Sequence, residues 1–271
     1  MKIIDAHLHF CNWPGFDELA RAAGHENTAE HLQQAYAKYG IQYGIVMSNR
    51  TLEPETHVYP DFLRYCIGLD RFVFDPGAIE QQAALVEANL QRETCVGIKL
   101  YPGYNRFYVA DDCLAPFYRL AEKYHKPVAV HMGQTANREG LLKYSHPLVL
   151  DEAAVKYPKV QFVMCHFGNP WLADAAAVIE KNPNVAADLS GLLEGKIPDM
   201  EDFFQRAGRY IDQLMGWIEY TQAYDRLMFG TDWPLANLGD YIAFTKHIIP
   251  PEHWNKVFFD NAARIYLGDK R

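Results

Sequence analysis

Several classes of protein leave marks that this chain does not carry. Its 271 residues include five cysteines, an odd number without a CxxC pair, so we expect reduced thiols in the cytoplasm rather than a disulfide framework. No stretch approaches the ~18 uncharged apolar residues that a membrane-spanning helix needs. The first segment, MKIIDAHLHF, places Asp5, His7 and His9 where a signal peptide would need an unbroken apolar run. We therefore expect a cytoplasmic protein that does not enter a membrane.

An excess of positive charge is also missing. Lysine and arginine total 26 against 34 for aspartate and glutamate, which gives a net charge of −8 at pH 7. Binding to a phosphate backbone needs a basic surface, so we expect no nucleic-acid partner. The chain has no low-complexity tract, charge block or Gly/Ser linker that would mark a boundary. We therefore expect one domain over residues 1–271.

What the chain does contain is a regular alternation of apolar runs and helical patterns. Eight apolar or β-branched runs recur along it: Lys2–Asp5, Tyr43–Met47, Tyr65–Leu69, Val96–Leu100, Val128–His131, Phe162–His166, Val185–Leu189 and Leu227–Gly230. Eight units in 271 residues average about 34 residues, enough for one strand, one helix and two loops. The pattern predicts an α/β fold with a parallel sheet closed into a single (β/α)₈ TIM barrel. An open doubly wound sheet is the alternative, although no GxGxxG turn follows an early strand.

Local signals place some of the helices and leave one unit short. Asn27 or Thr28 can cap the helical pattern that follows, and Gly40 stands at its end. The second unit has two prolines in RTLEPETHVYPDFL, which leaves room only for a short helix. Residues 200–224 are enough for two helices or one bent helix.

Potential metal ligands gather at the ends of the apolar runs. His7 and His9 form a His-x-His pair, and because residues two apart on a strand point to one face, both imidazoles can reach one ion. Four further ionisable side chains stand at matching strand ends: Lys99, His131, His166 and Asp232. Each alone has a structural interpretation, as a core histidine, a helix cap or a surface lysine. Together they predict a metal site at the C-terminal mouth of the strands, where barrel active sites are built.

Seven segments carry a resemblance to a known family: DAHLHF at 5–10, GIKLYP at 97–102, VHMG at 130–133, CHFGNPW at 165–171, DLSG at 188–191, FGTDWP at 229–234 and DNAARIY at 260–266. With them the sequence resembles the amidohydrolase superfamily, and within it the amidohydrolase-related branch that includes aminocarboxymuconate-semialdehyde decarboxylase. The resemblance implies a (β/α)₈ barrel with a divalent metal, usually zinc, in the mouth; manganese is the alternative. It also implies that His7, His9, His131 and Asp232 are ligands and that His166 is a ligand or a catalytic partner.

Lys99 leaves the number of metal ions open. In binuclear members of the superfamily, a carboxylated lysine on the fourth strand bridges two metals, and the mononuclear decarboxylase-like members lack that bridge. If Lys99 is carboxylated, His131 and His166 would hold a second ion. If it is a free ammonium, it would attract a substrate carboxylate. We favour one metal.

The site predicts a hydrolase that activates a water on the metal to cleave an amide, ester or lactone bond of a small metabolite. Asp232 would accept the proton of the water, and His166 would hydrogen-bond the substrate carbonyl. A non-oxidative decarboxylase or hydratase that acts on an aromatic or unsaturated carboxylic acid is the alternative, and the motifs do not separate the two. A barrel that binds metal only for stability would usually have lost ligands, and none is missing here.

Loops after the strands offer candidates for substrate binding. Trp13 in the first loop, Tyr101 in the fourth and Arg138 in the fifth favour a small carboxylate- or ring-bearing substrate, although loop cations are more often simply solvated.

Residues beside the ligands have supporting roles to fill. Asp188 or Ser190 is expected to support the site by a hydrogen bond. Cys165, next to His166, is expected on the outer face of its strand under a helix. Aromatic residues on the outer helices, where exposed, would favour a homo-oligomer.

Overall fold

Eight parallel strands follow one another around the molecule in chain order. The computed structural model describes residues 1–10, 13–47 and 50–268. Cys11 lies outside these ranges, and the other four cysteines form no disulfide with one another. Each strand pairs in parallel with the next one along the chain. The strands are β1 (Ile3–Leu8), β2 (Ile41–Val46), β3 (Leu63–Leu69), β4 (Cys95–Leu100), β5 (Val128–Val130), β6 (Phe162–Met164), β7 (Val185–Asp188) and β8 (Leu227–Met228). All eight fall where the apolar runs predict them.

Backbone hydrogen bonds between β1 and the chain around β8 close the sheet. The amide of Ala6 donates to the carbonyl of Phe229 at 2.9 Å, and that of Asp232 donates to His7 at 2.8 Å. The amide of His9 donates to Trp233 at 2.7 Å. The predicted (β/α)₈ barrel is therefore confirmed, and the open sheet is not formed.

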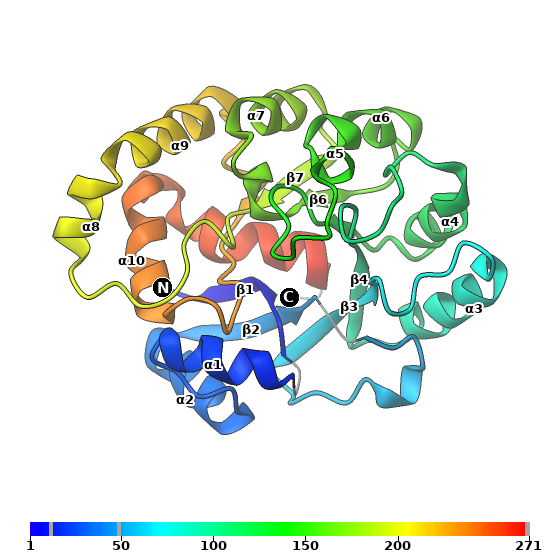
Figure 1. The fold of residues 1–271 in the computed structure, drawn as a ribbon, viewed down its shortest axis with the longest axis horizontal. Helices are drawn as coiled ribbons and strands as arrows, with labels where there is room; N and C mark the ends of the chain where they lie inside the picture. The colour runs from blue at the N-terminus through cyan, green and yellow to red at the C-terminus, as the bar shows by residue number, and fades with distance from the viewer. Residues whose placement is uncertain (11–12, 48–49, 269–271) are drawn as a thin grey trace.

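Helices surround the strands, as Figure 1 shows. They are α1 (Pro14–Ala22), α2 (Ala29–Tyr39), α3 (Ile79–Leu90), α4 (Ala115–Tyr124), α5 (Leu142–Ser145), α6 (Leu148–Lys156), α7 (Leu172–Lys181), α8 (Met200–Arg206), α9 (Gly208–Thr221) and α10 (Leu238–Ile248). The proline-bearing second unit forms only the 3₁₀ turn Pro54–Thr56, as predicted. Of the two alternatives for residues 200–224, the structure has two helices, α8 and α9.

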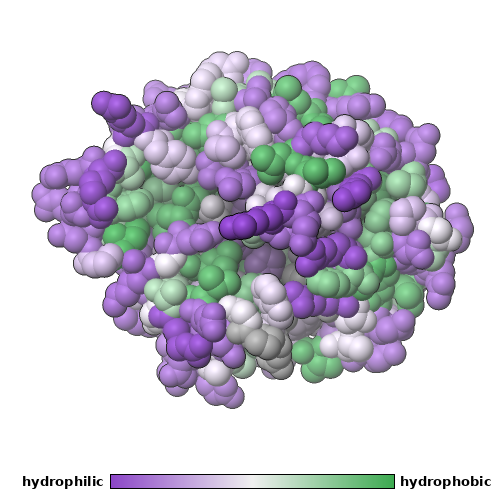
Figure 2. Space-filling view, viewed as in Figure 1, coloured by the Kyte–Doolittle hydropathy of each residue, from purple (hydrophilic) through white to green (hydrophobic). Residues whose placement is uncertain are grey.

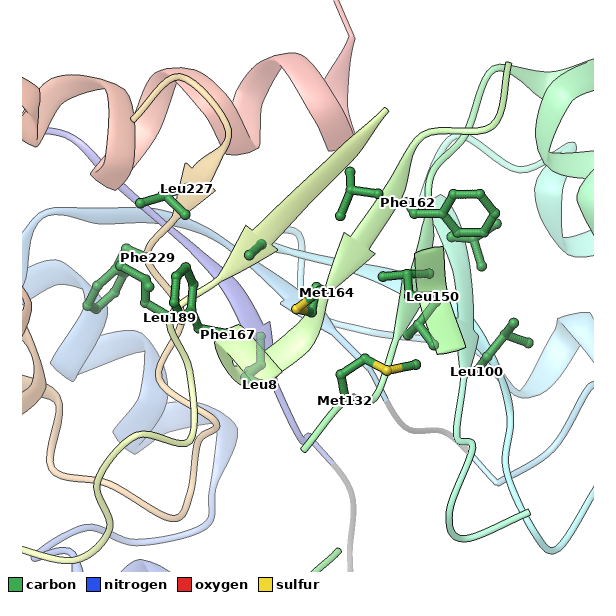
Figure 3. Packing of buried hydrophobic residues seen from close by; sticks show 14 of the residues in the cluster. Leu8, Leu100, Met132, Leu150, Phe162, Met164, Phe167, Leu189, Leu227 and Phe229 are labelled. Carbon is green, nitrogen blue, oxygen red and sulfur yellow. The ribbon is translucent and has the colours of Figure 1, made fainter. Parts of the chain in front are cut away.

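Alternation along the strands divides the core into two layers. Phe162 and Met164 of β6 point outward and pack with helix residues such as Leu150, as Figure 3 shows. Val163 between them points into the barrel, where it packs with Ala129 and other strand residues. Because small side chains fill part of this interior, the fully buried side chain of Lys99 can share it.

The C-terminal helical segment, which comprises Lys256–Asp260 and Ala263–Leu267, closes one end of the barrel. Ala262 and Tyr266 belong to the same buried cluster as Ile4 and Val96, which lie near the starts of β1 and β4. In Figure 1 this segment, drawn in red, crosses inside the ring of helices. The opposite end, where the strands finish, is left for a site.

The outer surface carries mixed side chains. The face in Figure 2 is mostly hydrophilic, with hydrophobic side chains in several separate areas and a recess near its centre. Among the helices described, none has the length and apolar character needed to cross a membrane.

Candidate metal centre

Three donors from the two ends of the chain meet at the mouth. Nε2 of His9 lies 3.0 Å from Oδ1 of Asp232, and Nε2 of His7 lies 3.5 Å from the same oxygen. One ligand atom from each residue lies within 4.8 Å of the others. Two imidazole nitrogens and a carboxylate oxygen are a donor set that zinc and related divalent ions accept.

The backbone forces this convergence. Leu8 packs in the outer layer, so His7 and His9 on either side of it face the mouth, and a register shift between Asp5 and Leu8 re-aims the end of β1. Asp232 has a positive φ of 57°, which turns its side chain back toward β1. The carboxylate of Asp5 accepts from Thr231 N at 2.9 Å and from Thr231 Oγ1 at 2.6 Å, which fixes the turn before Asp232.

The three donors have unsatisfied buried atoms. In the described part of the chain, Nε2 of His7, Nδ1 of His9 and Oδ1 of Asp232 are buried without a hydrogen bond of good geometry. A buried polar atom without a partner costs about 1–3 kcal/mol. An ion between them would satisfy Nε2 of His7 and Oδ1 of Asp232 together, so the residues present fit a divalent metal.

Protonation states at neutral pH suit metal binding. Burial, followed by the charge of Lys99, lowers the pKa of His7 to about 4, so its imidazole is neutral and has a lone pair to give. Burial opposes ionisation of Asp232, but the contacts with His9 and His7 outweigh it and hold the pKa of this carboxyl well below its usual range.

Asp188 decides which nitrogen of His7 faces the other donors. Its Oδ2 lies 2.9 Å from Nδ1 of His7, and its Oδ1 accepts from Ser190 Oγ at 2.5 Å and from the amide of His166 at 3.0 Å. Since an ionised carboxylate can only accept, Nδ1 of His7 carries the proton and Nε2 keeps its lone pair. Asp188 and Ser190 therefore occupy the supporting position that the sequence suggested.

His131 and His166 form a second imidazole pair beside the three donors. Nε2 of His166 lies 3.1 Å from Nδ1 of His131, and the His166 ring centroid lies 4.8 Å from that of His7. Burial lowers the pKa of both histidines, so both are neutral at pH 7, and one ring of the pair donates a hydrogen bond to the other. Nδ1 of His131 faces His166 and its Nε2 lies 3.2 Å from the carbonyl oxygen of Gln134, so His131 lies beside the three-donor cluster.

Lys99 and Cys165 lie together inside the barrel. Nζ of Lys99 is 2.7 Å from Sγ of Cys165, and Sγ of Cys165 lies within 4.8 Å of one potential ligand atom each of His7 and Asp188. The expectation that Cys165 faces outward was wrong. β6 ends at Met164, and the left-handed conformation of His166 (φ 62°) breaks the alternation, so neighbouring residues both reach the interior.

The three substrate-binding candidates, Trp13, Tyr101 and Arg138, differ in how exposed their side chains are and in whether their polar groups are already hydrogen-bonded. Tyr101 is buried and its hydroxyl donates to the carbonyl of Met47 at 2.5 Å, so its proton is engaged. Trp13 is 43% exposed and packs edge-on against Phe16, whose ring stacks 5.8 Å from His9. Arg138 is exposed on the loop after β5.

Tyr104, a second aromatic candidate of the loop after β4, lies beside His131. Its ring lies 4.9 Å from that of His131, and its hydroxyl oxygen accepts from the amide of Ala136 at 2.8 Å, so the hydroxyl proton remains to be donated. It stands three residues after Tyr101 in the same loop, and loop direction cannot be read from side-chain alternation.

Comparison with known proteins supports one family. The sequence model of the amidohydrolase family matches residues 4–267. A search of curated proteins gives no match.

Solved structures share the fold. An uncharacterized TIM-barrel protein from Bordetella bronchiseptica is 21% identical over 100% of both chains, with a TM-score of 0.72. A putative 2-pyrone-4,6-dicarboxylic acid hydrolase from Pseudomonas putida is 15% identical over 100% of this chain and 99% of its own, with a TM-score of 0.66. The 5-carboxyvanillate decarboxylase of Sphingomonas paucimobilis is 13% identical over 98% of this chain and 99% of its own, also with a TM-score of 0.66. At these identities the likeness shows the fold alone.

Proposed function

The chain belongs to the amidohydrolase family, and from this premise we propose that it is a metal-dependent hydrolase of a small metabolite. The observation that carries the proposal is the convergence of His7, His9 and Asp232. Among the described residues, Nε2 of His7 and Oδ1 of Asp232, which face each other, are buried without a hydrogen bond of good geometry. His131 is the proposed fourth ligand, and zinc or manganese the proposed ion. Bound there, a divalent ion supplies Lewis-acid polarisation of a water or of a substrate oxygen.

Asp232 and His166 have the two remaining roles in the proposed reaction, which are to accept a proton and to stabilise developing charge. Asp232 presents Oδ1 to His7 and His9 and keeps Oδ2 to accept a proton at the reacting centre. His166, whose ring lies between those of His7 and His131, is placed to hydrogen-bond the oxygen on which charge develops.

We favour one ion because of the surroundings of Lys99. A carboxylated Lys99 would have to reach His131 and His166, whereas its Nζ contacts Cys165 at 2.7 Å. Arg138 and Trp13 on the loops favour a substrate with a carboxylate or a ring, and the hydroxyl of Tyr104 adds a hydrogen-bond donor near His131.

A non-oxidative decarboxylase or hydratase is the second candidate function. The proton in the hydrogen bond of the neutral His131–His166 pair could be delivered to a carbon atom. A decarboxylase of an aromatic acid shares the fold. In that reaction the ion held by His7, His9 and Asp232 would bind the carboxylate of the substrate.

An activity screen with an Asp232→Asn variant tests this proposal. The metal-loaded protein is offered lactones, esters and amides in one panel and aromatic or unsaturated carboxylic acids in another, with release of acid and of CO₂ measured separately. We expect acid release, and a loss of about 10²–10⁴-fold in kcat in Asp232→Asn but not in the exposed control Asp61→Asn. A fully active Asp232→Asn variant would exclude the role of Asp232, and CO₂ release alone would select the second candidate.

A further inference from the structure

A lysine and a cysteine that the proposed reaction does not use lie against each other inside the barrel. Lys99 comes from β4 and Cys165 follows β6 directly, and neither side chain has exposed surface. Their Nζ and Sγ atoms are 2.7 Å apart. Charge-assisted bonds from nitrogen to oxygen measure ~2.7–2.9 Å, and sulfur is a larger atom than oxygen, so this approach is unusually close.

The surroundings leave the lysine without a carboxylate of its own. Asp188 is the nearby acid, but its oxygens are taken by His7, by Ser190 and by the amide of His166. Among the ion pairs of the described residues, none includes Lys99. The inner cluster that holds Cys165 is made mainly of apolar strand residues, Ala129 and Val163 among them, and Tyr266 of the C-terminal segment also belongs to it.

This arrangement favours covalent chemistry between the two side chains. A buried ammonium without a paired carboxylate is costly, and a link to sulfur would replace the ammonium by a neutral group. The two atoms are already held in contact by the paired barrel strands, so formation of the link costs little further ordering. The gap between them is wide enough for one bridging atom.

We propose that Lys99 and Cys165 are a redox-reversible modification site, at which peroxide joins Nζ to Sγ through one oxygen atom. In the first step the thiol sulfur attacks hydrogen peroxide, an S–O bond forms, the O–O bond breaks, and water leaves the sulfenic acid. Lys99 then releases its ammonium proton to solvent, and the neutral nitrogen attacks a second peroxide. An N–O bond forms, the O–O bond breaks, and water leaves the hydroxylamine. The hydroxylamine oxygen then displaces the sulfenic hydroxyl as a third water, which leaves Lys–NH–O–S–Cys. Sulfur and nitrogen are each oxidised by two electrons, and a dithiol reductant reverses both oxidations.

The link would change the chemistry of the neighbouring metal centre. One nitrogen cannot be both linked and carboxylated, so the oxidised protein is confined to the arrangement without a bridging lysine. It also loses the positive charge beside His7 and Asp188. The link does not depend on the proposed hydrolase activity, because it can be detected by the mass of the protein without measuring turnover.

Intact mass of the full-length protein is the direct test. The protein is treated with hydrogen peroxide, and part of it is then treated with dithiothreitol. We expect a gain of one oxygen and a loss of two hydrogens per chain, reversed by the reductant. In a tryptic map, cleavage after Lys99 should fail and the peptides that contain Lys99 and Cys165 should be joined. Free Lys99 with Cys165 unmodified or oxidised to sulfinic acid, or a link without the oxygen, would overturn the proposal.

Variants locate the link. Lys99→Arg and Cys165→Ala should each abolish the mass change. Cys66→Ala is the matched control, because Cys66 is fully buried in the same inner cluster and forms no disulfide. Loss of the link in Cys66→Ala would contradict the assignment. The measurement on the unaltered protein stands whether or not a variant folds.

Discussion

Asp188 is the residue on which the orientation of the first proposed ligand depends. Its contact with Nδ1 of His7, 2.9 Å long, turns Nε2 of that ring toward Asp232. Sequence reasoning could place Asp188 and Ser190 near the site, because Asp188 ends β7 and Ser190 lies two residues beyond it. It could not show that Asp188 serves two histidines, since the bond to the amide of His166 depends on how the chain turns after β6.

Asp188→Asn tests this dependence. Asparagine has one acceptor oxygen where aspartate has two, so it cannot accept both from Nδ1 of His7 and from the donors of Ser190 and His166, and the tautomer of His7 is no longer fixed. We expect metal affinity to fall about 10–100-fold, measured by competition with a chelator. The control is Asp174→Asn at an outer helix, which should bind metal as the parent does. Equal affinity in Asp188→Asn would show that His7 is oriented by something else.

At the scale of the element, strands were easier to predict than their ends. Apolar runs mark all eight strands, because a barrel strand is buried on both faces and hydrophobic residues are needed throughout. The ends are decided by backbone turns that carry no hydrophobic signal. At β6 the left-handed residues His166 and Phe167 begin two positions after Met164, and the predicted orientation of Cys165 failed there.

The structure decides which residue caps the N-terminus of helix α2. Of the two candidate caps, Thr28 is the one whose side chain accepts from His31 N, and Gly40 ends the helix with a φ of 74°. Thr28→Ala removes an acceptor from the first turn, so we expect a loss of about 1 kcal/mol in the free energy of unfolding. Urea unfolding measures it. Thr28→Ser should stay close to the parent, and an Ala variant as stable as the parent would mean that water replaces the cap.

At the scale of the whole molecule, buried neutral histidines tie stability to pH. Burial, followed by the charge of His31, lowers the pKa of His25 to about 4, and its Nε2 accepts from the amide of Leu238 at 3.1 Å at the start of α10. The unfolded chain binds the proton near pH 6.5 and the folded chain only near pH 4. Stability from this group is therefore complete above about pH 6.5 and is lost as the pH falls toward 4.

His25→Gln should reduce this dependence. The variant removes one titrating group, so its stability should fall less between pH 7 and pH 5 than that of the parent, although it is less stable at pH 7. Urea unfolding at both pH values measures the difference. A parent and a variant with the same loss between the two pH values would show that His25 takes no part.

The closed barrel brings His7 and His9 close to Oδ1 of Asp232, although His7 and Asp232 are 225 positions apart in sequence (232 − 7). The central claim is that these three side chains hold a divalent metal ion. Its most direct test is the metal content of the protein, purified without chelator, by elemental analysis. We predict about one divalent ion per chain, lost in His7→Ala/His9→Ala and retained in the exposed control His125→Asn. No metal after reconstitution, or an equal content in the double variant, would contradict the proposed centre, and about two ions would contradict the single site.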